Sequence, residues 1–300
     1  MKKYLSLILL STMLITAITV FSSCGKNDGV LKYSKESDGY HVTGVKDTAA
    51  TEIIIPEEID GTPVTVVDSF AFKDCTNVKK ITVPSSITTL SFCAFQNCTG
   101  LEELIFNAEN CTVNSPFSKA GTASGGVALT IGKTVKTVPA GLFIVQSGAG
   151  GEDLAKPIIK SVTFEEGSVC ETIGNSAFLN TDIAGVTLPD TVKRIDGSAF
   201  SGCLNMTSII LPESLESIGN YAFLSTPLTE LNIPANVTDI GSDIVKAKNS
   251  GIGTGEVTIQ SVTFADAEDW CSNITGDIIP ANELSSYMLA NGGNLKKKTN

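Results

Sequence analysis

The chain has 300 residues, of which 42% are hydrophobic but only 6% aromatic, and its formal net charge is -11 at pH 7. A chain of this length can bury a sizeable core, and the predominance of Ile, Val and Leu among its apolar residues favours strands. An acidic surface repels phosphate backbones, so nucleic acid is excluded as an expected partner.

Residues 1–23 are expected to be a signal peptide. Two lysines precede an apolar run over residues 5–21, and two serines stand directly before Cys24. Small residues before a cysteine resemble the lipobox of bacterial lipoproteins, in which that cysteine receives lipid and becomes the new N-terminus. Phe21 departs from the pattern, which prefers an aliphatic residue. The resemblance implies lipid attachment at Cys24, and an ordinary signal peptide cut nearby is the alternative.

Residues 24–29 are expected to form a lipid-anchored tether, and residues 30–61 an N-terminal cap. The dipeptide Asp38-Gly39 is a hairpin turn signal, because glycine tolerates positive φ. A β-hairpin here would cover the open end of the region C-terminal to it. The single histidine, His41, is expected to be an exposed strand residue, and any His-dependent catalytic or metal site would have to be built from it alone.

Residues 62–264 repeat one pattern about eight times, with a period near 22 or 23 where it is undisturbed. A strand of the form apolar-x-x-apolar-x-apolar comes first, often closed by a proline; a shorter apolar pair three residues apart follows; an Ala-Phe dipeptide ends the unit. The strand segments are 78–83, 101–106, 159–164, 183–188, 206–211, 228–233 and 259–264, with a truncated copy at 129–131. The Ala-Phe pairs end at Phe72, Phe95, Phe178, Phe200 and Phe223, with Phe117, Phe143 and Ile244 as weaker counterparts.

No single unit can bury these apolar residues, because each supplies one short strand and one turn. Stacking on neighbours pairs the strands and makes a continuous core, so the pattern predicts a β-rich solenoid with parallel strands, one per repeat, and short helical turns. With ~4.8 Å between strands, eight or nine rungs give a rod roughly 40 Å long. Phe178, Phe200 and Phe223 are then expected to align along a common axis.

The segment from Val192 to Cys203 carries the pattern most clearly and resembles the BspA-type leucine-rich repeat of bacterial surface proteins. The resemblance extends over about residues 40–264. It implies a curved leucine-rich-repeat solenoid with a parallel sheet, display at the cell surface and, in some members, adhesion to host matrix proteins or other cells.

Two insertions interrupt the regular array, near residues 118–126 and 145–156, and a third Gly-rich stretch spans 249–255. Extra residues in a stacked solenoid are expected to leave it as loops. Such loops often carry recognition. Their Gly and Ser content equally fits flexible insertions without a binding role.

The outward position just before the last apolar residue of each strand is the candidate ligand face. It reads Thr82, Ile105, Thr130, Thr163, Thr187, Ile210, Asn232 and Thr263. A threonine ladder is expected from β-propensity alone. As a binding surface it would be a flat, uncharged strip for protein contact, without the Trp or Tyr that usually stacks on sugar rings.

The cysteines follow the repeat: Cys75, Cys98 and Cys203 fall three residues after a repeat Phe, and Cys170 occupies an apolar slot. This recurrence predicts buried packing groups rather than reactive thiols. Cys75 and Cys98 lie on adjacent rungs, so a disulfide between them is the alternative.

Residues 265–300 depart from the repeat and are expected to form a C-terminal cap and basic tail. They contain the only tryptophan, Trp270, a short helical stretch near 283–290, and the lysines 296–298, which are expected to be a solvated end.

The sequence predicts no catalytic, metal or cofactor site. Gly132-Lys133-Thr134 lacks the spacing of a phosphate-binding loop. The acid pairs at 165–166 and 266–269 could serve a glycoside hydrolase, but nothing indicates that they face each other across a cleft.

The leading hypothesis is a non-catalytic cell-envelope lipoprotein, anchored at Cys24 to the outer membrane and exposed at the surface, that binds a host or microbial surface protein or glycan. Membrane contact would come through the lipid alone, with no cofactor. A structural or accessory component of an envelope assembly is the alternative, and a hydrolase using a carboxylate pair is the third.

Overall fold

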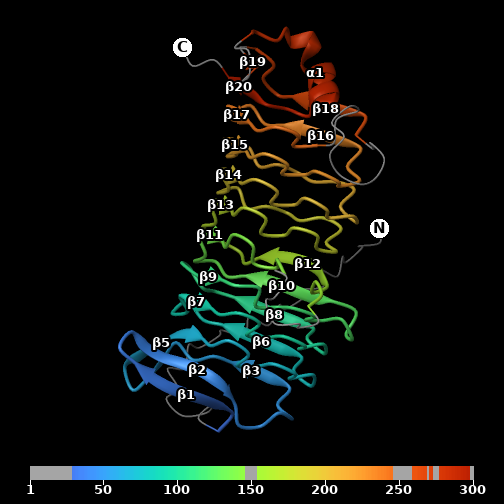
Figure 1. The fold of residues 1–300 in the computed structure, drawn as a ribbon. Coiled ribbons are helices and arrows are strands. Elements are labelled where there is room, and N and C mark those ends of the chain that lie inside the picture. The colour runs from blue at the N-terminus through green and yellow to red at the C-terminus, as the bar shows by residue number, and fades with distance from the viewer. Residues whose placement is uncertain (1–28, 146–153, 246–258, 269, 273–276, 298–300) are drawn as a thin grey trace, which may run out of the picture.

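The computed structural model describes residues 29–145, 154–245, 259–268, 270–272 and 277–297. Within them the chain winds into an elongated solenoid, with the N-terminal cap at one end and the C-terminal cap at the other (Figure 1). The predicted β-rich repeat fold is confirmed. Each rung contributes a longer strand to one side and a two-residue strand to another, and a turn carrying the repeat Phe closes the third side.

The longer strands form the long-strand face. Five pair in parallel in the order β12-β10-β8-β6-β3, and two more pair as β16-β18. Their bounds are β3 Glu52–Ile54, β6 Lys80–Val83, β8 Glu103–Phe106, β10 Val127–Ile131, β12 Ile159–Phe164, β16 Glu230–Ile233 and β18 Ser261–Phe264. Because β3 already pairs with β6, the ladder begins inside the predicted cap, and the expected boundary at residue 61 is wrong.

Two of the predicted strands are weaker than expected. Residues 183–188 and 206–211 contribute only an isolated bridge between Thr187 and Ile210. Gly185 and Ser208 stand there at the position that Lys80 occupies in β6, and both are poor strand formers. The long-strand face therefore has a weakly paired middle section between two regular sheets.

The short strands form the second face, which is continuous over most of the solenoid. The orders are β1-β2-β5-β7-β9 and β11-β13-β14-β15-β17-β20-β19, in which β1 spans Leu31–Glu36, β2 Gly39–Val45, β19 Trp270–Ser272 and β20 Leu295–Lys297. The bounds are β5 Thr62–Val67, β7 Thr89–Leu90, β9 Thr112–Val113, β11 Thr137–Val138, β13 Thr172–Ile173, β14 Arg194–Ile195, β15 Ser217–Ile218 and β17 Asp239–Ile240.

The N-terminal cap is the predicted hairpin. Strands β1 (Leu31–Glu36) and β2 (Gly39–Val45) pair antiparallel, and β2 continues in parallel onto β5. Gly39 begins β2 with φ +139° rather than lying in the turn, and a Cβ there would come within 2.5 Å of the Pro63 carbonyl oxygen. A second hairpin joins β4 (Glu58–Ile59) to β5. The sheet of the cap is thus continuous with the first rung.

The C-terminal cap closes the other end. It consists of β19 (Trp270–Ser272), η1 (Ala281–Glu283), α1 (Leu284–Asn291) and β20 (Leu295–Lys297). Strand β20 lies antiparallel between β17 and β19, which covers the edge of the last short strand. Trp270 is buried in this cap. The predicted solvated lysine end is wrong for Lys297, which is half-buried and paired with Asp266; Lys296 lies in β20 but its side chain is exposed, and Lys298 falls outside the described residues.

The repeat phenylalanines form one buried column through the solenoid. Neighbouring ring centroids are 5.0 to 6.2 Å apart from Phe72 to Phe223. The predicted alignment of Phe178, Phe200 and Phe223 is confirmed. Ile244 was expected to follow Phe223, but the Phe223 N–H donates to the Ile244 carbonyl oxygen as the Phe200 N–H donates to that of Ala222. Ile244 thus occupies the Ala slot.

The turn that carries each Phe is held by backbone hydrogen bonds to the next rung. In one rung the N–H groups of Ser176 and Phe178 donate to the carbonyl oxygens of Gly197 and Ala199, each at 2.9 Å. Residues two before and two after the Phe adopt positive φ, as at Ser176 (54°) and Asn180 (58°). Small or Asn/Asp residues tolerate this conformation, which explains why they hold most of these positions; Phe70, Lys119 and Tyr221 are exceptions.

The Gly-rich insertion near 118–126 packs against the body. The Gly126 N–H donates to the Gly121 carbonyl oxygen at 3.0 Å, and the Ala123 N–H donates to that of Thr99 at 2.9 Å. This insertion is a turn on the preceding rung rather than a projecting loop. The other two Gly-rich stretches, 147–153 and 249–255, and the proposed anchor Cys24 lie outside the described residues.

Candidate binding surfaces

The candidate ligand face is aligned by the parallel pairing of the long strands. Thr82 lies beside Ile105, Ile105 beside Thr130, and Thr130 beside Thr163. Further along, Thr187 pairs with Ile210, and Asn232 with Thr263. We call this row the outward strip. The structure brings its residues together in three blocks rather than in one unbroken ladder.

The exposure of the outward strip is lowest in β6, β8 and β10. Thr82, Ile105 and Thr130 are half-buried, whereas Thr163, Thr187, Asn232 and Thr263 are exposed. Ile210 is 81% exposed, the highest value among the large hydrophobic residues described.

Ile54 of β3 extends the strip by one rung and is 42% exposed, and the Thr263 hydroxyl group hydrogen-bonds to Oδ1 of Asn232. Sequence reasoning missed Ile54 because β3 was assigned to the cap.

Charges beside the strip neutralise one another. Lys79 Nζ lies 2.8 Å from Glu102 Oε1, and Lys80 Nζ lies 3.5 Å from Glu103 Oε2. The hydrogen bond from Lys79 lowers the pKa of Glu102. The N-terminal part of the face therefore presents paired charges around an uncharged centre.

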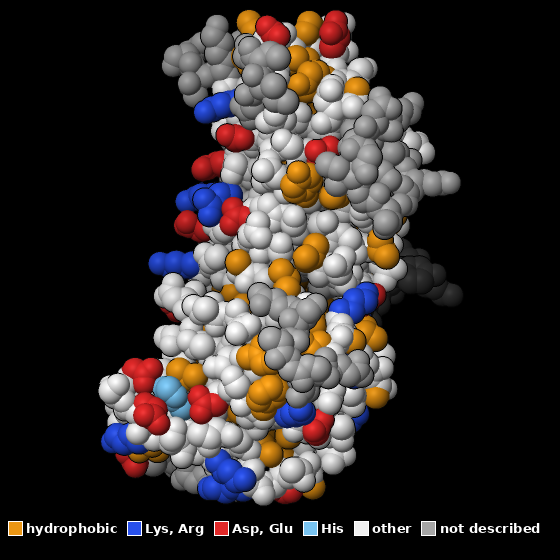
Figure 2. All heavy atoms as spheres, viewed as in Figure 1, with side chains coloured by type: hydrophobic (Ala, Val, Ile, Leu, Met, Phe, Trp, Pro, Cys, Tyr) orange, Lys and Arg blue, Asp and Glu red, His pale blue; other side chains and the backbone are white. Residues whose placement is uncertain are grey.

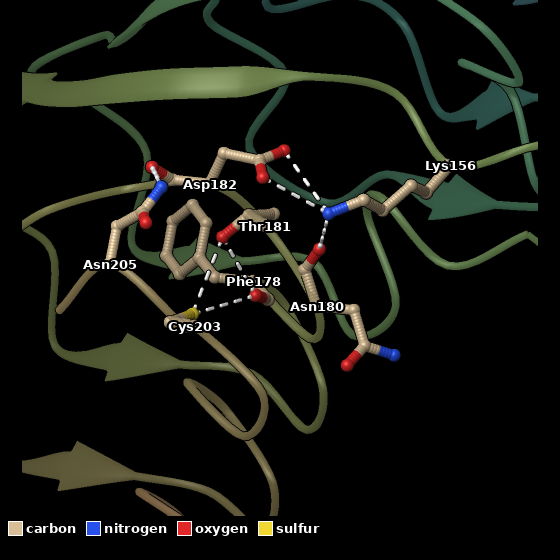
Figure 3. Close-up of polar contacts among 7 residues, drawn as sticks. All are labelled: Lys156, Phe178, Asn180, Thr181, Asp182, Cys203 and Asn205. Atoms are coloured by element: carbon tan, nitrogen blue, oxygen red, sulfur yellow. Dashed lines mark hydrogen bonds and ion pairs between the residues drawn. The ribbon is translucent and has the colours of Figure 1, made fainter. Parts of the chain in front are cut away.

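The cysteines of the repeat are packing groups, as predicted. Cys98 Sγ donates to the Phe72 carbonyl oxygen at 3.3 Å, and Cys203 Sγ to that of Phe178 at 3.2 Å (Figure 3). Thr181 fills the same slot, and its hydroxyl group donates to the Phe178 carbonyl oxygen at 2.9 Å. Burial raises the pKa of Cys203 to about 11 and that of Cys98 further still. None of the described cysteines forms a disulfide.

Lys156 holds the C-terminal end of the second insertion against the solenoid. Its Nζ lies 3.1 Å from Asp182 Oδ1 and donates to the Asn180 carbonyl oxygen at 3.2 Å (Figure 3). Asn205 Nδ2 in turn donates to the Asp182 carbonyl oxygen at 3.0 Å. These contacts link successive rungs and assign Lys156 a structural role.

The candidate acid and histidine groups are engaged in structural contacts. His41 lies in a strand as expected, but its side chain is only 20% exposed, with Nε2 3.0 Å from Asp38 Oδ1 and Nδ1 3.5 Å from Asp68 Oδ1. Glu165 Oε2 accepts from the Lys133 N–H at 3.0 Å.

Asp266 pairs with Lys297 at 2.6 Å, and that hydrogen bond lowers the pKa of Asp266. Among the described residues, no three His, Cys, Asp or Glu side chains cluster in a way that would hold a metal ion.

A second candidate surface lies at the corner where each short strand turns toward its Phe segment. It encloses about 560 Å³. The larger polar side chains lining this corner groove are Asn175, Arg194, Asp196, Asn220, Tyr221 and Asp239. A further hollow of about 230 Å³ shares Asn175 and continues toward Val113. The sequence signal for it, the glycines after the short strands at 174, 219 and 241, was not recognised.

Charge and apolar character separate on the side shown in Figure 2. Charged side chains gather along the edge over the short strands and on the N-terminal cap, whereas apolar side chains lie along the middle. No helix within the described ranges is long and apolar enough to cross a membrane.

Comparison with known proteins shows similarity to repeat proteins of bacteria. Residues 46–143 and 156–252 match the family model described as BspA type leucine rich repeat region, in six copies. No curated protein matches the chain.

Three solved structures are similar to parts of the chain. A leucine-rich repeat protein from Bacteroides ovatus is 21% identical over 78% of this chain and 66% of its own, with a TM-score of 0.40. A leucine-rich cell surface protein from Faecalibacterium prausnitzii is 15% identical over 82% and 96%, with a TM-score of 0.35. The pneumococcal vaccine antigen PcpA is 16% identical over 80% and 83%, with a TM-score of 0.35. The chain thus spans just under two thirds of the Bacteroides ovatus protein.

Proposed function

Because the chain belongs to the family with the BspA type leucine-rich repeat region, we propose that it is a lipid-anchored surface protein that binds another protein without catalysing a reaction. The lipid would sit on Cys24, hold the N-terminal end of the solenoid at the outer membrane and leave the distal rungs exposed. The partner would be a host or microbial surface protein. Leucine-rich repeats are commonly binding scaffolds, and fold alone does not name the partner.

The observation that carries this proposal is the outward strip. Ile54, Ile105 and Ile210 stand among uncharged threonines; sheet pairing fixes the spacing of Ile54 and Ile105, whereas an isolated bridge holds Ile210 in the weakly paired middle section. A preordered surface loses little conformational freedom on binding. Ile210 is the strongest candidate for an anchor, since it is 81% exposed and has no large neighbour in its bridge to Thr187.

A hydrolase remains the weaker candidate. Of the acids considered for it, Glu165 accepts from the Lys133 backbone N–H and Asp266 pairs with Lys297, while Asp269 lies outside the described residues. These contacts stabilise a turn and the C-terminal cap.

The binding proposal is tested with an Ile210→Glu variant. The full chain, purified in mild detergent, is immobilised and incubated with biotinylated surface proteins of bacterial and animal cells. Loss of a retained protein in Ile210→Glu supports the proposal, provided that Ile278→Glu, which changes a 63% exposed residue in the C-terminal region, retains it. Equal retention by both variants and the wild type would contradict a role for the strip.

Anchoring is tested separately by replacing Cys24. The Cys24→Ala variant is expected to leave the membrane fraction and to lose the mass of the lipid. Protease treatment of intact cells then distinguishes surface display from an envelope assembly facing the periplasm, because only a surface-exposed chain is digested. Survival of the wild-type chain would favour the structural or accessory role.

A further inference from the structure

We infer that the corner groove is a second binding site, and that its ligand is an extended neutral glycan. The proposal goes beyond the protein-binding role of the outward strip and does not depend on it, because the groove lies beside the short strands. It rests on the shape of the groove, the state of its backbone and the chemistry of its side chains.

The groove exists because small residues follow the short strands in the distal rungs. A Cβ on Gly219 would lie 2.4 Å from the Gly197 nitrogen, and one on Gly241 would lie 2.4 Å from Asn220 Oδ1. Rungs therefore approach closely at this corner without filling it. In the proximal rungs the same corner is filled by Phe70 and Phe92, whose ring centroids are 5.6 Å apart.

Part of the groove backbone is already engaged in hydrogen bonds between rungs. The Gly219 N–H donates to the Ile195 carbonyl oxygen at 2.7 Å, and the Gly241 N–H to that of Ile218 at 2.8 Å. The Ser198 N–H donates to the Asn220 carbonyl oxygen at 2.8 Å. A peptide adding itself here as another strand would find these three N–H groups already bonded, so side chains are expected to carry most of the recognition.

Those side chains offer both donors and acceptors. Arg194 Nε lies 3.0 Å from Asp196 Oδ1 and its Nη2 donates to Oδ2 at 3.5 Å, which orients the guanidinium group and leaves its remaining N–H groups for a ligand. Asn220 Oδ1 accepts from the Ser242 N–H at 2.8 Å, and its amide nitrogen makes no hydrogen bond within the described residues. The carboxylate of Asp239, on the neighbouring rung, likewise has no hydrogen-bond partner in that part of the chain.

Tyr221 supplies the flat surface that the outward strip lacks. It lies in the groove, half-buried, with φ +61° at the position held by Ser198 in the preceding rung. A tyrosine ring has an apolar face and a polar hydroxyl group, which suits a ligand that is itself amphipathic. Sugar rings present such faces together with many hydroxyl groups that both donate and accept.

The balance of charge favours a neutral glycan over an acidic one. The groove holds one arginine and two aspartates, and the arginine is already paired with Asp196. A uronic acid or sulfate would meet the unpaired carboxylate of Asp239. A protein partner would find little aliphatic surface here, because Ile195 and Ile218, the aliphatic residues of the lining, are buried.

The two hollows suit a chain rather than a single sugar. They run from the rung of Val113 to the rung of Gly241 and meet at Asn175. With ~4.8 Å between rungs this length is roughly 24 Å. An oligosaccharide of several units can therefore contact the groove along the solenoid axis.

The test uses an array of neutral and acidic oligosaccharides of about four to eight sugar units, followed by calorimetry with the best neutral one. The full chain in mild detergent is compared with Tyr221→Ser and Arg194→Thr. Both substitutions install residues that the repeat itself uses at these slots, Ser198 and Thr172, so the rungs are expected to fold. Each variant is expected to weaken binding of the neutral oligosaccharide roughly tenfold or more.

Ile210→Glu is the matched control, because it alters the outward strip and leaves the groove untouched. Retained glycan binding in this variant separates the groove from the protein-binding proposal. The inference is overturned if no neutral oligosaccharide binds at millimolar concentration, if acidic glycans bind instead, or if Tyr221→Ser and Arg194→Thr bind as well as wild type. It is also overturned if these two substitutions abolish retention of a protein rather than a glycan.

Discussion

The rings of Phe72 and Phe95 are parallel, with their centroids 5.0 Å apart and 1° between their planes. This spacing is close to the ~4.8 Å between paired strands, so the ring stack repeats the backbone ladder in the core. The same column continues to Phe223 with gaps of at most 6.2 Å. Each ring is thus both a core residue of its own rung and a contact of the next.

Truncating a ring in the middle of the column is expected to be costly. In Phe200→Ala the neighbours Phe178 and Phe223, at 5.4 and 5.7 Å, would face an empty space. The expected loss is about 3–5 kcal/mol in the free energy of unfolding, measured by urea denaturation and circular dichroism. Leu204→Ala, at a residue 66% exposed, should change it by no more than about 0.5 kcal/mol. Similar values for both would refute the column as a core.

Glycine at the corner is expected to be irreplaceable where rungs touch. In Gly219→Ala the new Cβ would lie 2.4 Å from a backbone nitrogen, so the rungs must separate, at an expected cost of about 1–3 kcal/mol. Gly185→Ala is the control, because its nearest atom is 3.6 Å away; there we expect a gain of about 0.4–1 kcal/mol. Thermal denaturation of both variants decides the matter, and an unaffected Gly219→Ala would speak against close contact.

Alkaline pH is expected to weaken the fold through the buried thiols. Burial raises the pKa of Cys170 and Cys203 to about 11 from the ordinary value of 9.0. Between these values the unfolded chain releases protons that the folded chain retains, so stability is complete below about pH 9 and falls as pH rises. The slope is about 1.4 kcal/mol per pH unit for each thiol, before changes from other groups.

Cys203→Thr isolates one such contribution. Threonine already fills this slot at Thr181 and Thr226, where each hydroxyl group donates to the carbonyl oxygen of the preceding Phe. The variant is expected to fold. Its free energy of unfolding should fall less steeply between pH 9 and 11 than that of the wild type, by the contribution of one thiol, measured by urea denaturation at each pH. An unchanged slope would mean that Cys203 does not titrate in this range.

The C-terminal strand is expected to be part of the stable fold. A chain ending at Asn294 loses the buried Leu295 and exposes the edge of β17, which now pairs with β20. We expect a lower melting temperature, a loss of about 1.5–3 kcal/mol for Leu295 alone, and aggregation through the open edge. A chain ending at Lys297 keeps β20 and should behave as wild type. Equal melting temperatures would show that the strand is dispensable.

Sequence periodicity predicted the repeat, the Phe column and the buried cysteines, because each follows from stacking units that cannot fold alone. It failed at Ile244, which was assigned to the Phe position of the repeat but occupies the Ala position, because no Phe marks the register there. It also failed at the lysine end, since its pairing with β17 depends on a partner 57 residues earlier (Asp239 with Lys296). The corner groove was missed because it arises where glycines have no side chain, and an absent side chain leaves no trace in the apolar pattern.

The direction of the hydrogen bonds between rungs also has a mechanical consequence. They point along the long axis, so if the N-terminal cap is anchored and a partner is bound as proposed, a pull between the two stretches these bonds in series rather than loading them all in shear. Under such tension the solenoid is expected to yield rung by rung, each of about 22 residues releasing at most ~70–80 Å of chain. A tethered protein built this way would lengthen under load by unfolding some rungs while its remaining rungs stay folded.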